Sequence, residues 1–325
     1  MKSSQTRNNT GQRVILQTTI ASSITLRGVA LHAGTPVTVT VQPAPADFGI
    51  VFDRVDLARS GVDTRVRVAV DSLIEANLCT LIGNDCGVTV STIEHLMAAL
   101  AGCGIHNALV SIDGPEVPIL DGSASPFVAA FMQAGIRRLP APLRAIRVRR
   151  IVEVREGSAF ARLEPADHLS IAFEIDFPDR AIGRQHKELC LSNGTFVREL
   201  SDSRTFCRQA DVDLMHANGL ALGGSYANAV VVQGDLVLTP GGMRHADEPV
   251  RHKMLDAMGD LAVAGAPILG RYVGHRAGHT LTGRLVRALL SQADSHERVT
   301  VSRTAAYFMP GAGVCRVEPD LARAG

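Results

Sequence analysis

Several features that mark specialised classes of protein are missing from this sequence. No run of about 18 or more apolar residues occurs, and the polar residues 1–13 lead into no apolar stretch, so we expect neither a membrane span nor an export signal. The 33 Lys and Arg residues balance the 32 Asp and Glu residues, for a formal net charge of +1. Without an excess of positive charge, the composition argues against a nucleic-acid partner.

Cysteine is scarce, and its spacing follows no recognisable framework. The six cysteines include no CxxC pair: Cys79, Cys86, Cys103, Cys190, Cys207 and Cys315. This usage is typical of reduced thiols in a cytosolic enzyme, so we expect a cytoplasmic location and no disulfide bonds. Coiled-coil heptads and other signatures of assembly are also missing, and we expect a monomer.

What the sequence does contain is enough apolar material for a large core. Of the 325 residues, 46% are hydrophobic and 20% are charged, which predicts a soluble globular protein of two domains. The first half opens with strand-like stretches at residues 14–16 and 37–43, where valines alternate with other residues. Helical patterns follow at residues 92–101 and 125–134.

The second half repeats this order. Apolar residues alternate over residues 171–177, residues 229–232 resemble a buried strand, and helical patterns follow at residues 250–264 and 281–293. Strands followed by a pair of helices in each half predict an α+β fold of two similar domains, although no repeat of identical residues is visible.

Two closely spaced prolines mark the boundary between the halves. Pro140 and Pro142 cannot continue a helix or a central strand, and the basic residues 137–150 around them are more simply solvated charges than a phosphate-binding or membrane-binding patch. We therefore expect an N-terminal α+β domain over residues 14–138, a linker over 139–145, a C-terminal α+β domain over 146–300 and a tail over 301–325. No function is evident for the tail or for the N-terminal extension.

The run of residues 251–261 has two different faces when it is drawn as a helix. At about 100° per residue, His252, Asp256 and Asp260 fall on one stripe. The apolar residues fall roughly opposite: Met254, Leu255, Met258 and Leu261. One face is therefore predicted to pack, and the other to offer ligands. In the upstream helical pattern, the apolar stripe likewise leaves His95 pointing away from it, beside Glu94.

His95, His252 and Asp256 could supply the three protein ligands of a catalytic zinc ion, which keeps its fourth position for water. A histidine and an aspartate at positions i and i+4 project from the same side of a helix, so both can bind one ion. An exposed His–Asp pair without a metal explains that spacing more simply, because short motifs also occur by chance. The spacing by itself leaves both interpretations open.

The candidate proton-transfer groups also have alternatives. Glu94 suits a general base beside a metal ligand, but Ser91 and Glu94 have the spacing of a helix capping box. His275 or His279, in a segment that contains glycines, could act as a general acid, although a loop histidine is usually only a polar surface residue. Asp260 could hydrogen-bond such a histidine and raise its pKa, or it could be a solvated aspartate.

Six segments resemble, in order and spacing, the bacterial UDP-3-O-acyl-N-acetylglucosamine deacetylases: STIEHL (91–96), LDGS (120–123), SRTF (203–206), LGGS (222–225), VRHKMLD (250–256) and GHTL (278–281). The earlier segments GVALHAG (28–34) and PAPA (43–46) fit the same family. The resemblance extends from about Thr18 to about Ala293. Each motif is weak by itself, but their ordered occurrence over most of the chain is specific.

The resemblance implies a fold of two α+β sandwiches, each a sheet packed on a helix pair, with the active site between them. It also implies zinc-dependent removal of acetate from UDP-3-O-acyl-N-acetylglucosamine, the committed step of lipid A assembly in Gram-negative bacteria. The implied cofactor is Zn²⁺, and the implied partner is this small acylated nucleotide sugar.

The resemblance further implies roles for individual residues. The zinc ligands are His95, His252 and Asp256. The proton-transfer groups and their helpers are Glu94 as general base, His279 as general acid, Asp260 as the aspartate that orients the acid, and Thr205 as a hydroxyl that helps to hold the oxyanion. The substrate contacts are Leu31, Phe206 and Lys253.

Some features depart from the family or stay open. Thr282 stands where the family usually has asparagine, so local hydrogen bonding is expected to differ. Residues 207–224 lie where the family carries an acyl-binding insertion, although core packing would explain their leucines equally well, and the acyl length cannot be read from them. A zinc hydrolase for another N-acyl sugar remains an alternative. So does a catalytically silent zinc-containing binding protein, against which the intact Glu94 and His279 argue.

Overall fold

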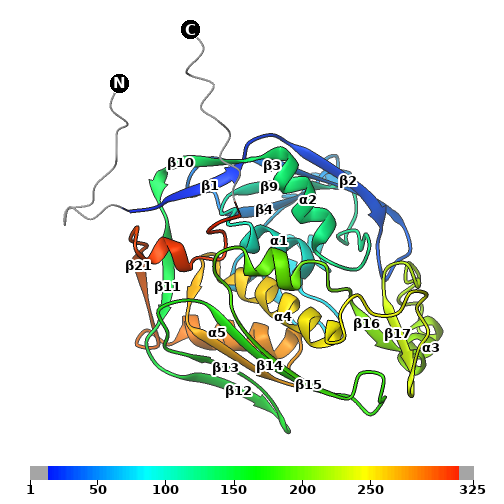
Figure 1. Ribbon diagram of the computed structural model, residues 1–325. Helices are drawn as coiled ribbons and strands as arrows, with labels where there is room; N and C mark the ends of the chain where they lie inside the picture. The colour runs from blue at the N-terminus through cyan, green and yellow to red at the C-terminus, as the bar shows by residue number, and fades with distance from the viewer. Residues whose placement is uncertain (1–13, 315–325) are drawn as a thin grey trace.

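The computed structural model describes residues 14–314, which form an α+β fold. A five-stranded sheet lies in the first half of the chain (Figure 1). In spatial order its strands are β2 (Ile24–Val29), β3 (Pro36–Pro43), β9 (Ala108–Ile112), β4 (Ile50–Arg54) and β5 (Arg65–Arg67). The predicted alternation in β3 is confirmed, because Val37, Val39 and Val41 are all buried, as a strand with one face on the core requires.

A second five-stranded sheet forms in the other half. Its strands, in spatial order, are β12 (Val152–Glu156), β13 (Ala159–Glu164), β20 (Arg271–His275), β14 (Ser170–Asp176) and β15 (Arg184–Cys190). In each sheet the last strand along the chain is inserted between the second and the third, and it is parallel to the third. All other neighbours are antiparallel. The predicted similarity of the two halves is therefore confirmed in their topology.

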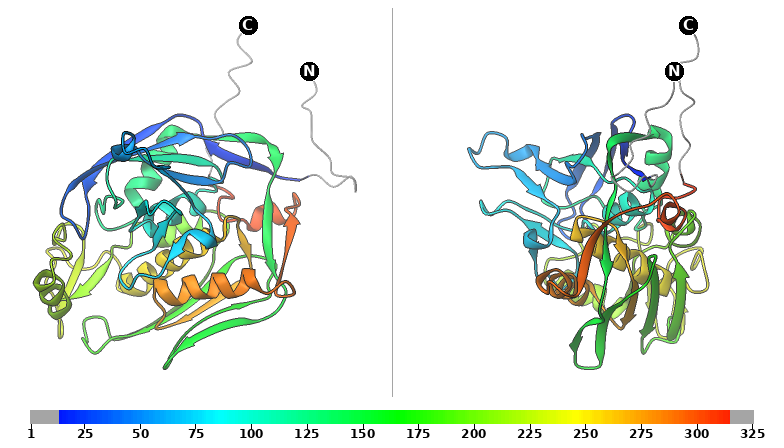
Figure 2. Two further views of the ribbon diagram at one scale, coloured as in Figure 1. Left: turned by 180° about the vertical axis from the view of Figure 1, so that it is seen from behind. Right: turned by 90° about the vertical axis from the view of Figure 1, so that its left-hand side faces the viewer.

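Four helices lie between the two sheets, and Figures 1 and 2 show them as an inner layer. They are α1 (Glu94–Gly102), α2 (Ser125–Ala134), α4 (Glu248–Leu261) and α5 (His279–Ser291). α1 packs directly on α4, and an added Cβ at Gly259 would lie 2.1 Å from the carbonyl oxygen of Glu94. The apolar residues of both halves merge into one core. Within residues 14–314, no helix has the length and apolar character that a membrane span requires.

The polar face of α4 is as buried as its apolar face. His252, Asp256 and Asp260 are 3%, 4% and 2% exposed, since α1 and α5 both pack on α4. The alternative of an exposed His–Asp pair is therefore wrong. A helix that buries carboxylates and imidazoles must give them partners, because an unpaired buried charge is strongly destabilising.

Shorter elements extend from each half. In the first half these are η1 (Val55–Leu57), η2 (Val70–Ser72), β6 (Leu73–Ile74), β7 (Leu81–Gly83) and β8 (Thr89–Val90). In the second half they are the π-helix η3 (Phe196–Leu200), β16 (Phe206–Arg208), α3 (Gln209–Ala217), β17 (Val230–Gln233), β18 (Leu236–Val237), η4 (Ala262–Ala264) and η5 (Ala305–Phe308). β16, α3 and β17 form a projection at one edge of the molecule (Figure 1).

Edge strands connect the two halves. β1 (Leu16–Ile20) pairs with β10 (Ile136–Pro142), and β11 (Arg144–Val148) lies between β19 (Ile268–Leu269) and β21 (His296–Thr300). The two prolines are accommodated because β10 belongs to a two-stranded sheet and not to a sheet centre.

The residues predicted as a linker, 139–145, are the end of β10 and the beginning of β11. Val301, at the start of the predicted tail, donates its backbone N–H to the carbonyl oxygen of Leu143 and is buried. The domain boundaries themselves stay a prediction. The N-terminal extension, the end of the tail and Cys315 lie outside the described residues.

The contact at Gly259 generates a matched pair of mutations. We expect Gly259→Ala to lower the free energy of unfolding by about 1–3 kcal/mol, because the new methyl group must push α1 away from α4. Gly283→Ala in α5 is the control: its Cβ would lie 3.7 Å from Leu73, an ordinary contact. That change should stabilise the helix by about 0.5–1 kcal/mol. Equal denaturant midpoints for the two variants would contradict the proposed steric role of Gly259.

Candidate active site

Three side chains from two helices converge at the interface of the two halves. His95 lies on α1, and His252 and Asp256 lie one turn apart on α4. Their donor atoms all lie within 4.8 Å of one another, and all three residues are buried. Nε2 of His252 is 3.2 Å from Oδ1 of Asp256, and Nε2 of His95 is 3.6 Å from the same oxygen. The three residues predicted as zinc ligands are therefore brought together.

The surrounding contacts leave one donor atom of each α4 residue facing the centre of this group. Nδ1 of His252 donates to the carbonyl oxygen of Ser203 at 3.0 Å, which leaves Nε2 without a proton when the ring is neutral. Lys253 Nζ donates to Oδ2 of Asp256 at 2.7 Å, whereas Oδ1 is buried and has no hydrogen-bond partner within the described chain. Two imidazole nitrogens and a carboxylate oxygen make a donor set that suits Zn²⁺.

The electrostatics of the group favour a neutral His252 and an ionised Asp256. Burial lowers the pKa of His252 to about 4, so its ring is neutral at pH 7 and its Nε2 lone pair is available. Burial opposes ionisation of Asp256, but the neighbouring His252 and Lys253 hold the pKa of its carboxyl well below the usual range. A neutral imidazole and a carboxylate are the forms that bind a metal ion.

Glu94 is the first residue of α1 and directs its carboxylate into the same space. It is 4% exposed, and its Oε2 accepts a hydrogen bond from the backbone N–H of Thr80 at 2.9 Å. Burial raises the pKa of this carboxyl against the opposing effect of His279 and His95. The predicted capping box is wrong, because the hydroxyl of Ser91 instead donates to the carbonyl oxygen of Pro115. The Glu94 carboxylate is therefore held by Thr80 and takes no part in capping α1.

His279 begins α5 and completes the group. Its Nδ1 lies 3.0 Å from both carboxylate oxygens of Asp260, and its Nε2 lies 3.9 Å from Oδ2 of Asp256. Although burial opposes protonation, Asp260 and Glu94 raise the pKa of His279 to about 9. His279 is therefore an imidazolium at pH 7, held in one orientation by Asp260.

His275 does not join this group. It lies on β20, where its Nδ1 is 3.3 Å from Oε1 of Glu174 and its ring stacks on Phe160. Of the two histidines that the residues alone left open as the acid, only His279 therefore reaches Asp260.

Two of the predicted oxyanion and substrate residues, Phe206 and Lys253, contact the ligand group directly. The Phe206 ring meets the His252 ring edge-on at 6.2 Å between centroids. Thr205, one residue earlier, donates its backbone N–H to the carbonyl oxygen of Gly122, so it bridges the two halves. Lys253 contacts Asp256 as described above. Leu31 accepts a backbone hydrogen bond from Gly223 in the loop that follows α3.

Thr80 is a member of the site that no sequence pattern indicated. Its backbone N–H is the donor to Glu94, its Oγ1 contacts Oδ1 of Asp260, and it lies 3.4 Å from Nδ1 of His279. A lone threonine between β6 and β7 carries no motif, so only the fold reveals it. A cavity opens beside it, lined among others by Leu73, Asp260 and His279.

Most of the segment that matches the acyl-binding insertion lies outside the core, although Ala221 is buried. Residues 207–224 comprise the rest of β16, α3 and the loop after it, and α3 has no buried residue. Leu214 and Leu222 are 64% and 57% exposed. Core packing therefore does not explain these apolar side chains.

Thr282, which departs from the family pattern, finds its hydrogen-bond partners nearby. This residue is buried in α5, and its hydroxyl donates to the carbonyl oxygen of Gly278 at 3.2 Å and lies 2.9 Å from the Tyr272 hydroxyl. A buried amide is thus not needed at this position for hydrogen bonding to be complete.

Comparisons with known proteins point to one family. The family model for UDP-3-O-acyl N-acetylglycosamine deacetylase matches residues 17–291. A protein of Phenylobacterium zucineum (strain HLK1), named UDP-3-O-acyl-N-acetylglucosamine deacetylase, is 49% identical over 281 residues, which cover 86% of this chain and 95% of the relative. A Shewanella baltica (strain OS155 / ATCC BAA-1091) protein of the same name is 43% identical over 307 residues, 93% of this chain and 99% of the relative.

The Asp260–His279 pair predicts a specific pH dependence. Because the pKa of His279 is about 9 in the folded state, above the unfolded value of about 6.5, its stabilising effect is complete below pH of about 6.5. The effect is lost as the pH rises through about 9. Asp260→Asn removes the anion, so the pKa of His279 should fall and this dependence should flatten. Histidine NMR titration of metal-free protein measures the shift.

Glu174→Gln is the control for this titration. It removes the carboxylate beside His275 and should leave the pKa of His279 in place. An unchanged pKa of His279 in Asp260→Asn would refute the electrostatic coupling of the pair.

Proposed function

The chain belongs to the UDP-3-O-acyl-N-acetylglucosamine deacetylase family, and on that premise we propose that it removes acetate from this nucleotide sugar with one zinc ion held by His95, His252 and Asp256. One observation carries the zinc assignment. Three buried donor atoms converge within 4.8 Å, and Oδ1 of Asp256 has no hydrogen-bond partner among residues 14–314. A carboxylate oxygen buried in this way requires a cation or another donor to compensate its desolvation.

The donor atoms of these residues are of the kinds that bind zinc. A zinc ion bound there would polarise the acetyl carbonyl group and lower the pKa of a water molecule, as it does in other hydrolases. His95, His252 and Asp256 are three protein ligands, the number that leaves a further position for reactants.

Glu94 and His279 carry the protons in this proposal. Glu94 accepts a proton from the attacking water. Burial raises the pKa of this carboxyl toward the working pH, where a group can both accept and release a proton. His279, protonated at pH 7, donates a proton to the departing amine. Asp260 keeps the imidazolium charged until that step, and it fixes Nδ1 so that Nε2 faces the reacting atoms.

Charge that develops on the acetyl oxygen needs fixed donors. Thr205, held by backbone hydrogen bonds to Gly122 and Val230, is proposed to place its hydroxyl there. Lys253 adds a positive charge, because the nearby Asp256 raises its pKa although burial lowers it. Groups held in place before the reaction stabilise such charge without reorganisation.

The substrate is proposed to lie across both halves. Phe206, beside His252, and Leu31, beside the loop that follows α3, are the proposed contacts of the sugar and its acyl chain. The exposed leucines of the 207–224 segment offer apolar surface for the chain. The product would enter lipid A assembly, and we expect the enzyme to act as a cytoplasmic monomer.

Metal removal tests the proposed reaction. Purified, zinc-loaded protein should release acetate from UDP-3-O-acyl-N-acetylglucosamine, and a chelator should abolish the release until zinc is restored. Circular dichroism of the chelated sample checks that it remains folded. Well-folded, zinc-bearing protein that instead hydrolyses another N-acyl sugar, or binds ligand without releasing acetate, would overturn the substrate or the reaction.

Two neighbouring substitutions separate the base from the ligands. Glu94→Gln should retain zinc while the turnover falls by about 10²–10⁴-fold, the usual contribution of a general base. His95→Ala should lose zinc, as metal analysis would measure. Glu188→Gln, a surface carboxylate paired with Arg271, serves as the control and should change neither property. Equal zinc loss in Glu94→Gln and His95→Ala would make Glu94 a ligand or a structural residue.

A further inference from the structure

Glu248, a fully buried carboxylate at the start of α4, takes no part in the proposed chemistry. Its Oε1 accepts hydrogen bonds from the backbone N and from Nε of Arg204, both at 2.9 Å. Its Oε2 accepts from Nη2 of Arg204 at 3.2 Å and from the backbone N of Arg244 at 2.6 Å. The side chain of Arg204 is itself only 9% exposed and also donates to the carbonyl oxygen of Gly242.

Stability alone is a weak explanation for this ion pair. Desolvation of two buried charges offsets much of their attraction, so packed apolar residues would often stabilise a fold as well. What an ion pair with several hydrogen bonds does provide is a fixed geometry. The question is therefore which groups this geometry fixes.

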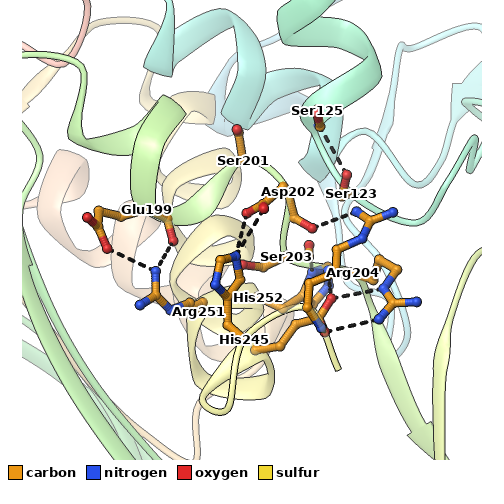
Figure 3. Close-up of polar contacts among 12 residues, drawn as sticks. Ser123, Ser125, Glu199, Ser201, Asp202, Ser203, Arg204, His245, Arg251 and His252 are labelled. Atoms are coloured by element: carbon orange, nitrogen blue, oxygen red, sulfur yellow. Dashed lines mark hydrogen bonds and ion pairs between the residues drawn. The ribbon is translucent and has the colours of Figure 1, made fainter. Parts of the chain in front are cut away.

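Arg204 lies between two residues of the proposed site. Ser203, on one side, offers the carbonyl oxygen that accepts the hydrogen bond from Nδ1 of His252. Thr205, on the other side, is the proposed oxyanion residue. Glu248 is four residues before His252 on α4, and Arg204 directly follows Ser203. The ion pair therefore connects the helix that carries the donor, His252, to the segment that carries the acceptor, Ser203. Figure 3 shows Arg204, Ser203 and His252 side by side.

Other contacts also hold the same segment, one to α4 and one to the residues just before it. Figure 3 shows Arg251 with Glu199, and His245 with Asp202. These four side chains are partly exposed. The segment follows the π-helix Phe196–Leu200, an irregular helix of the type that often occurs beside functional sites. The Glu248–Arg204 pair is the buried contact of this set.

The same carboxylate also reaches the first half of the chain. The backbone of Arg244 is held by Glu248, and its side chain donates to the carbonyl oxygen of Asp202 and to Oδ2 of Asp121. Gly122, next to Asp121, accepts the backbone hydrogen bond of Thr205. The Thr205 backbone is therefore restrained from both halves.

We propose that Glu248 and Arg204 are positioning residues: their buried ion pair holds the Ser203 carbonyl oxygen against Nδ1 of His252, so that Nε2 is presented to the metal in a single tautomer, and it holds Thr205 in place. This inference rests on the proposed function, because it takes His252 to be a metal ligand. The residues that orient a metal ligand typically contribute about 10–100-fold to metal affinity.

The test compares Arg204→Lys and Glu248→Gln with a matched control, Arg54→Lys. Arg54 also has a side chain 9% exposed, and it binds Asp56 through two nitrogens and Thr89 through a third. The zinc dissociation constant is measured by chelator competition, together with the melting temperature, kcat and KM. We expect both site variants to bind zinc about 10–100-fold more weakly and to lose kcat, with KM within about twofold. Arg54→Lys should lose thermal stability alone.

A second readout does not depend on activity. In metal-free protein, ¹⁵N NMR of the His252 ring should show one tautomer, protonated at Nδ1, in the wild type and in Arg54→Lys, and a mixture in Glu248→Gln. Glu248→Gln nearly preserves the side-chain shape, so it carries the test if Arg204→Lys fails to fold. Unchanged zinc affinity and an unchanged tautomer in a folded site variant would overturn the inference. A wild type that binds no zinc would instead refute the proposed function.

Discussion

The close packing of α1 on α4 fixes how the two halves of the chain meet. Gly259 lets the two helices approach until the carbonyl oxygen of Glu94 lies where a side chain would begin. At that separation His95 reaches the pair formed by His252 and Asp256, and two halves with the same topology share one core. The site therefore exists only where the halves meet, and neither half contains all three of the proposed zinc ligands.

Burial at this interface is what gives the residues their chemistry. A histidine that loses solvent becomes neutral unless nearby carboxylates outweigh the cost of burying its charge, and a carboxylate that loses solvent becomes a better base. His252 and His279 illustrate the contrast, with pKa values of about 4 and about 9 in one small space. The difference arises because His279 faces two carboxylates, Asp260 and Glu94, which outweigh its burial, whereas the Asp256 carboxylate beside His252 does not.

Much of this arrangement could be predicted from the sequence, because helices and strands produce periodic patterns of apolar and polar residues. The stripe that places His252, Asp256 and Asp260 on one side of a helix is read directly from their spacing, and the alternation in β3 is equally legible. The capping box at Ser91 does not form, although the spacing of Ser91 and Glu94 suits one. The helix begins at Glu94 itself, so Ser91 does not occupy the N-cap position. The roles of Thr80 and Glu248 could not be predicted in this way, since their partners are distant in the chain.

Patterns along the chain are enough to predict the α+β class, the helices that carry the proposed ligands and, through the ordered motifs, the family. Three features required the packing of distant elements: the burial of the polar face of α4, the meeting of His279 rather than His275 with Asp260, and the pairing of Arg204 with Glu248. The first set can be predicted because periodic patterns depend on neighbours along the chain. The second set cannot, because burial and hydrogen-bond partners depend on which elements pack together.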